Sequence, residues 1–150
     1  MDNDNLIQVC EIINSRYNPQ FIKEAYTLLS VLFNNIIKKP GEDKFRLFNL
    51  SNNNIKNKVL IIKEIYDLIE IIGYYDYQEN FMRFDGSPAT LEEVVNILNI
   101  YLEENEKQLK IQEELEKEAL ERLKKSNNEA IKNIEKQKEK KIIKQEKEIN

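Results

Sequence analysis

The chain has 150 residues, of which 41% are hydrophobic and 33% are charged, and its 23 basic and 27 acidic side chains give a formal net charge of −4. This length predicts one ordinary domain with an appendage, and the acidic balance argues against nucleic acid or an anionic membrane as partner, since both attract clustered Lys and Arg. Because it has no histidine and a single cysteine, Cys10, the chain excludes an intrachain disulfide, a zinc site built from His and Cys, and any catalytic arrangement that needs an imidazole.

The same features predict the compartment. A lone cysteine fits a reducing environment. The first residues, MDNDNLIQ, are acidic and polar and lack the features of a signal peptide, and no apolar run approaches the roughly 20 residues of a membrane span. We therefore expect a protein of the cytoplasm or the nucleus.

Two helices are predicted at the start of the chain. Apolar residues between Leu6 and Ile13 indicate a short first helix, in which Cys10 falls among the apolar positions and is interpreted as a core residue. Asn18 and the proline that follows it are typical of a helix start, as an N-cap and a first helical residue.

The second helix continues with apolar residues at steps of three and four from Phe21 to Ile36, and Pro40 and Gly41 end it. After this turn, the alternating sequence FRLFNLS predicts a short strand from about Phe45 to Ser51.

A strongly apolar run, VLIIKEIYDLIEIIGYY, begins at Val59. Its few polar residues lie along one stripe, which predicts a mostly buried helix at the centre of the fold, and Gly73 is well placed to end it as the C′ residue. Two brief stretches, around Tyr75–Gln78 and Phe81–Phe84, are interpreted as edge strands. Thr90 to Glu93 reads as a capping box at the start of another helix.

From Glu103 onward the composition changes to Glu, Lys and Gln without proline or glycine, with 13 basic and 13 acidic side chains, so that the remaining 10 basic and 14 acidic side chains of residues 1–102 carry the whole net charge (10 − 14 = −4). The apolar residues of this segment do not keep an a/d heptad register for three repeats. We interpret it as a solvent-exposed helix, with a coiled coil and disorder as the alternatives.

The predicted fold class is therefore α+β: a helix-dominated domain with a small antiparallel β-sheet, followed by a long charged C-terminal helix. The predicted organisation is a helical lead-in over residues 1–18, a domain over residues 19–102, and a charged helical extension over residues 103–150.

Five short motifs follow one another within the predicted domain. They are Asn35-Ile36-Ile37, Pro40, Lys44-Phe45-Arg46, Ser51-Asn52 and Gly73-Tyr74. In this order and on these elements, the chain resembles the PUB (PUG) domain, a small adaptor fold found in cytoplasmic peptide N-glycanase, in UBX-domain proteins and in a ubiquitin ligase. The resemblance covers about residues 20–101, and the charged tail lies outside it.

What the resemblance implies is a non-enzymatic adaptor, monomeric and without a cofactor. PUB domains bind the C-terminal tail of the hexameric AAA ATPase valosin-containing protein, an acidic tail with an aromatic residue just before its end. The implied role lies in ubiquitin-linked protein quality control, which includes ER-associated degradation.

The resemblance assigns peptide binding to seven residues, which are Asn35, Lys44, Phe45, Arg46, Asn52, Gly73 and Tyr74. Lys44 and Arg46 would offer positive charge to an acidic segment. Phe45 and Tyr74 would form the walls of a slot for an aromatic side chain.

Asn35 would hold the peptide backbone through its amide, and Gly73 would let the ligand approach the main chain closely. Since an unsatisfied buried amide is costly, Asn35 is either exposed, hydrogen-bonded within the fold, or available to a ligand. These alternatives stay open in the sequence.

The chain departs from the PUB pattern at three positions. Phe45 replaces a tyrosine and loses its hydroxyl, and Ser51 replaces a glycine. Asn49 stands where relatives carry a basic residue, which would weaken the attraction to an acidic tail.

Several of the candidate residues also have a purely structural explanation. Phe45 and Phe48 lie three apart on the predicted strand, so that one of them is expected to face the core. Asn52 is well suited to cap a following helical turn. Lys44 and Arg46 would serve equally as plain solvated charges.

An enzyme and a structural protein are the two other classes of function. Peptide N-glycanase itself needs a Cys-His-Asp arrangement, which a chain without histidine cannot supply. The alternative to an adaptor is a structural protein that assembles through its charged C-terminal helix, with the globular part as a cap.

Overall fold

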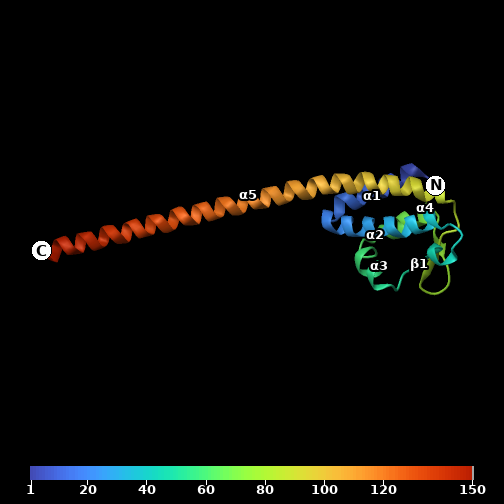
Figure 1. Cartoon of the computed structure of the whole chain (residues 1–150), viewed down its shortest axis with the longest axis horizontal. Coiled ribbons are helices and arrows are strands. Elements are labelled where there is room, and N and C mark those ends of the chain that lie inside the picture. Colours follow the sequence, from blue (N-terminus) through green and yellow to red (C-terminus); the bar gives the residue numbers. More distant parts are fainter. Residues whose placement is uncertain (150) are drawn as a thin grey trace. The chain divides into compact units, whose positions relative to one another are not determined.

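The computed structural model describes residues 1–149, with side chains up to residue 147, and it divides into two compact units (Figure 1). Unit 1 is Met1–Leu109, and unit 2 begins at Lys110. The elements are α1 (Asn3–Arg16), α2 (Pro19–Lys38), the 3-10 helix η1 (Asp43–Arg46), β1 (Leu47–Asn49), α3 (Asn53–Lys58), α4 (Ile65–Ile72), β2 (Tyr75–Asp76), β3 (Phe81–Arg83) and α5 (Pro88–Ile149). The predicted α+β class, with a small antiparallel sheet and a long C-terminal helix, is confirmed.

Helices α1, α2 and α3 start on a capping Asp or Asn side chain. The Asp2 Oδ1 accepts hydrogen bonds from the backbone N–H groups of the first turn of α1, and the Asn18 side chain does the same for Gln20 of α2. The Asn52 side chain caps α3, as predicted. These caps satisfy amides that have no partner inside their own helix.

The capping box predicted at Thr90–Glu93 is wrong. Helix α5 begins three residues earlier than a Thr90 cap would place it, at Pro88, where the Ser87 Oγ accepts a hydrogen bond from the Ala89 N–H at 3.2 Å. Proline at the first helical position loses no hydrogen bond there, and the Ser-Pro pair therefore sets the helix start.

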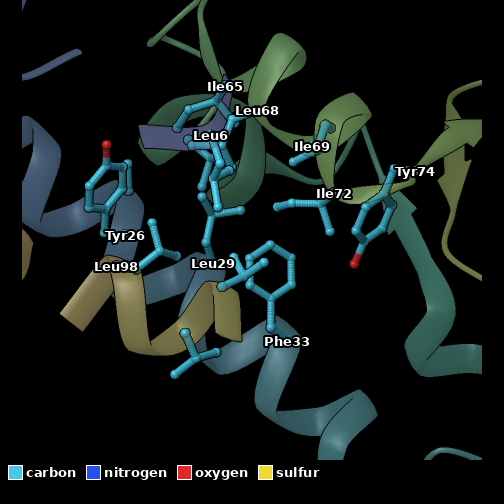
Figure 2. Packing of buried hydrophobic residues seen from close by; sticks show 14 of the residues in the cluster. Leu6, Tyr26, Leu29, Phe33, Ile65, Leu68, Ile69, Ile72, Tyr74 and Leu98 are labelled. Carbon is cyan, nitrogen blue, oxygen red and sulfur yellow. The ribbon is translucent and has the colours of Figure 1, made fainter. Parts of the chain in front are cut away.

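One hydrophobic core holds unit 1 together, and five helices contribute to it, α3 through Ile55. Figure 2 shows side chains from the other helices meeting in the core, among them Leu6 of α1, Leu29 and Phe33 of α2, Ile69 of α4 and Leu98 of α5. Residues 1–18 belong to this core, since Leu6, Cys10 and Ile13 are fully buried. Burial of such side chains, at about 25 cal/mol per Å² of apolar surface, is the main force that stabilises the unit.

The three strands form one antiparallel sheet in the order β1-β3-β2, with Phe48 opposite Met82 and Tyr75 opposite Arg83. Phe48 and Met82 are buried while the residues on either side of them are half-buried, as expected for a sheet with one face on the core. The interpretation of residues 81–84 as an edge strand is wrong, because β3 lies in the centre of the sheet.

The strand predicted from Phe45 to Ser51 is shorter than expected. Phe45 lies in η1, and only Leu47–Asn49 is extended. The Asn49 Oδ1 accepts hydrogen bonds from the Ser51 N–H at 3.0 Å and from the Ser51 hydroxyl at 2.8 Å. This side-chain turn replaces strand pairing and ends β1.

The helix predicted from Val59 onward begins only at Ile65. The residues between form turns, in which the Ile62 N–H donates to the Val59 carbonyl at 3.2 Å. Val59 and Ile62 are fully buried although they are not helical. A run of β-branched residues has reduced helix propensity, and here tertiary burial decides its conformation.

Unit 2 consists of the continuation of α5. Every side chain from Lys110 to Lys147 is exposed in the single chain, and the predicted long C-terminal helix is confirmed over these residues. Among the described residues no helix is long and apolar enough to cross a membrane.

Candidate peptide-binding surface

The positive charge of unit 1 is concentrated in one segment. Residues 38–63 carry seven basic and two acidic side chains (7 − 2 = +5), whereas the rest of unit 1 carries four basic and fifteen acidic ones (4 − 15 = −11). We call residues 38–63 the basic segment. It covers the end of α2, η1, β1 and α3, and six of its basic side chains are exposed: Lys38, Lys39, Lys44, Lys56, Lys58 and Lys63.

Lys44 and Phe45 lie on η1, which contacts α2. The Lys44 Nζ is 5.1 Å from the centre of the Phe45 ring, a cation–π distance, and 3.5 Å from the Glu42 Oε2. The Lys44 side chain is 73% exposed, and Phe45 is half-buried against the core. An ammonium group beside a partly open aromatic ring is therefore accessible to a ligand.

Arg46 has a structural role that the sequence does not predict. Its Nε donates to the Pro40 carbonyl at 3.0 Å, and its Nη1 donates to the carbonyls of Phe84 and Gly86 at 3.0 and 3.1 Å. The interpretation of Arg46 as a plain solvated charge is wrong. The guanidinium joins the turn after α2 to the segment that follows β3, and its positive charge stays within the basic segment.

Tyr74 is a core residue, and its predicted place in the wall of an open slot is wrong. Only 5% of it is exposed, and its ring centre lies 6.1 Å from that of Phe33, 5.8 Å from that of Phe48 and 5.3 Å from that of Phe84. Burial raises the pKa of the Tyr74 hydroxyl, and the charge of Arg46 opposes this rise. Figure 2 shows the ring with the other core side chains.

Asn35 is half-buried near the C-terminal end of α2. Its backbone carbonyl accepts a hydrogen bond from the Lys39 N–H at 3.1 Å, whereas its side-chain amide makes no hydrogen bond to another described residue. Of the three alternatives that the sequence leaves open, this rules out the hydrogen bond within the described fold, and an amide exposed to solvent and an amide available to a ligand both remain.

Asn52 and Gly73 have structural explanations. The Asn52 Oδ1 accepts the Asn54 and Ile55 N–H groups at 2.9 and 3.2 Å, which leaves its amide NH₂ for a ligand. Gly73 ends α4 with φ +123°, a conformation that other residues adopt with strain, and a Cβ there would lie 3.4 Å from the Phe84 ring. Asn52 therefore fixes the start of α3, and Gly73 fixes the end of α4.

The structure brings Lys44, Phe45 and Arg46 together on η1 against the end of α2, and it places Tyr74 in the core. The residue-by-residue assignment missed the exposed lysines of α3, Lys56 and Lys58. A count of charge along the chain would have found them, because acidic residues are rare between positions 38 and 63.

Groups with chemical reactivity are few among the described residues. No three His, Cys, Asp or Glu side chains there lie close enough together to hold a metal ion. Cys10 is fully buried, and burial raises the pKa of its thiol to about 11, which disfavours the reactive thiolate.

Comparison with known proteins adds no family assignment. A scan against models of protein families finds no match, and a search of curated proteins finds no similar sequence. The resemblance to PUB domains therefore stays a prediction from the five motifs.

Proposed function

We propose that this chain is a non-enzymatic adaptor of the PUB type, working in the cytoplasm in ubiquitin-linked protein quality control. Its ligand is the acidic, aromatic-containing C-terminal tail of the AAA ATPase valosin-containing protein. The observation that supports this proposal most strongly is the basic segment, with its excess of five positive charges in a unit that is otherwise acidic. An acidic peptide is attracted to this segment and repelled by the rest of unit 1.

Three kinds of contact would follow the first electrostatic attraction. The Lys44 ammonium would pair with a carboxylate of the peptide, and the half-buried Phe45 ring would contact its aromatic side chain. The Asn35 amide would bond to the peptide backbone. So small a set of contacts predicts an affinity near micromolar, about −8 kcal/mol.

The Lys44→Glu variant tests the electrostatic part of the proposal. The measurement is a calorimetric titration with a synthetic acidic peptide that carries a penultimate tyrosine. The variant should bind this peptide with a Kd at least about tenfold higher than that of the unchanged protein, since an attractive contact becomes repulsive. Added salt should weaken peptide binding to the unchanged protein, because the Lys44 side chain is 73% exposed.

Lys107→Glu is the matched control. Lys107 is exposed in unit 1 but lies outside the basic segment, so this variant has the same net charge as Lys44→Glu. It should bind the peptide nearly as well as the unchanged protein. Equal losses of peptide affinity in the two variants would mean that net charge alone governs binding. If the peptide gave no heat of binding even with the unchanged protein, the proposed ligand would be refuted.

The Asn35→Ala variant tests the amide contact. Because the Asn35 side chain makes no hydrogen bond to another described residue, its loss should leave the melting temperature unchanged or slightly higher, since alanine has the better helix propensity. Peptide affinity should fall at least about tenfold, or 1.4 kcal/mol, as the peptide loses a hydrogen-bonding partner.

Asn96→Ala serves as the control for this change, since Asn96 is exposed on α5. It should alter neither melting nor binding. If Asn35→Ala kept full affinity and a normal melting temperature, the peptide would not contact the end of α2.

A further inference from the structure

A second surface of unit 1 is opposite in character to the basic segment. Helix α1 and the first part of α5 enclose a hollow of about 190 Å³, which we call the acidic groove. Its lining is Ile7, Glu11, Ile97, Ile100, Tyr101 and Glu104. Ile100 is 63% exposed and Ile7 is 40% exposed, so apolar surface in this groove is open to water.

The charge of the groove is negative and largely uncompensated. The Glu11 Oε1 accepts a hydrogen bond from the Tyr101 hydroxyl at 2.7 Å. Within the described part of the chain, neither Glu11 nor Glu104 forms an ion pair with a basic side chain. An occupant that fits this groove has a small apolar side chain with positive charge on both sides of it.

Such a feature occurs in unit 2 of the chain itself. Residues 131–147 carry seven basic and three acidic side chains (7 − 3 = +4). On a helix, Lys136, Lys140, Ile143 and Lys147 follow at steps of four, three and four along one face, which also carries Glu139 and Glu146. Residues 136–147 as a whole carry six basic and two acidic side chains (6 − 2 = +4), so positive charge prevails around Ile143. Ile143 is 52% exposed, and it is the apolar residue in this row of lysines.

We propose that the acidic groove binds residues 136–147 of a second copy of this chain. The Ile143 side chain enters the hollow and packs on Ile7 and Ile100. The lysines on either side of it pair with Glu11 and Glu104, which have no other ionic partner among the described residues.

This contact joins two different surfaces, so one copy offers its groove and the next offers its helix. A heterologous contact of this kind can repeat from copy to copy. Pairing of two tails as a coiled coil is disfavoured. The a/d positions 120, 123, 127, 130 and 134 cover only about two heptads, and one of them is the polar Asn127 among Leu120, Leu123, Ala130 and Ile134. The groove is acidic and the basic segment is not involved, so the inference is independent of the proposed function.

Two single variants and their mixture test the proposal, with sedimentation velocity of the full chain over a wide range of concentration. Ile100→Lys places a positive charge in the groove, and Ile143→Glu removes the apolar side chain and adds a negative charge. Both positions are exposed, so neither change disturbs the core. We expect the unchanged chain to associate with rising concentration and each variant alone to associate at least about tenfold more weakly.

The equimolar mixture of the two variants decides the geometry. The Ile100→Lys copy keeps an intact helix and the Ile143→Glu copy keeps an intact groove, so the mixture should form a 1:1 dimer that cannot extend. Ile61→Lys and Leu120→Glu are matched controls at exposed positions outside the two surfaces, and both should associate like the unchanged chain.

Three results would overturn the proposal. The first is an unchanged chain that stays monomeric at every concentration, which includes the case of a tail bound to its own groove. The second is a mixture of variants that forms no dimer. The third is loss of association in Leu120→Glu with normal association in Ile100→Lys, which would show that two tails pair as a coiled coil.

Discussion

Replacement of Tyr74 by alanine is expected to lower the free energy of unfolding by about 3–5 kcal/mol, the range for removal of a buried aromatic ring. The ring lies within 6.1 Å, centre to centre, of Phe33, Phe48 and Phe84, and its loss leaves a cavity among them. Tyr74→Phe keeps the ring and should change this free energy by less than about 1.5 kcal/mol, because the hydroxyl makes no hydrogen bond to another described residue. Urea denaturation followed by circular dichroism measures both changes.

Tyr66→Ala provides the comparison. Tyr66 lies on α4 and is 39% exposed, so its truncation should cost much less than that of Tyr74, about 0.5–1 kcal/mol. Equal costs for the two tyrosines would mean that Tyr74 is not part of the core. The open slot that the PUB resemblance implies would then be restored as the better interpretation of this residue.

Arg46→Ala is expected to lower the free energy of unfolding by about 2–4 kcal/mol, since hydrogen bonds that involve a charged group contribute more than neutral ones. Three carbonyls, of Pro40, Phe84 and Gly86, lose their donor at once. Arg46→Lys should recover only part of this loss, because one ammonium group cannot replace a planar guanidinium that reaches two separate segments. Thermal unfolding and urea denaturation provide the measurement.

Lys44→Ala is the control for this change, since the neighbouring lysine is 73% exposed and should alter stability by no more than about 0.5 kcal/mol. If Arg46→Ala were as stable as the control and only bound the acidic peptide more weakly, the guanidinium would serve the ligand and not the fold. The expected result instead makes Arg46 unsuitable as a probe of binding, because its loss disturbs the surface that carries Lys44 and Phe45.

Much of the helical structure could be predicted from the sequence because its signals are local. The Asn18-Pro19 start and the three-and-four spacing of apolar residues mark α2, and the same kind of spacing marks α1. Asn52 signals the start of α3 in the same way. The helix prediction failed for Val59 to Ile62. An apolar run has the same sequence pattern whether it forms a helix or a turn held by tertiary packing.

The candidate site was harder to predict because its residues depend on distant parts of the chain. Two of the carbonyls that Arg46 binds, those of Phe84 and Gly86, lie 38 and 40 residues away along the chain, and no local sequence pattern predicts these contacts. Tyr74 and Tyr75 are adjacent and chemically identical, yet one is buried and the other is 43% exposed. Only the path of the chain after Gly73 decides which ring enters the core.

Helix α5 combines two levels of local stability within one element. In its first turns Leu91, Val94 and Leu98 are fully buried, so their amide hydrogens are protected by the global stability of unit 1. Beyond Leu109 the described side chains are exposed, and an isolated helix in water gains little beyond its own backbone bonds. Turns of the distal helix can therefore open and close without loss of the core, which makes residues 110–147 the natural place for proteases to cut and for a partner to order the chain.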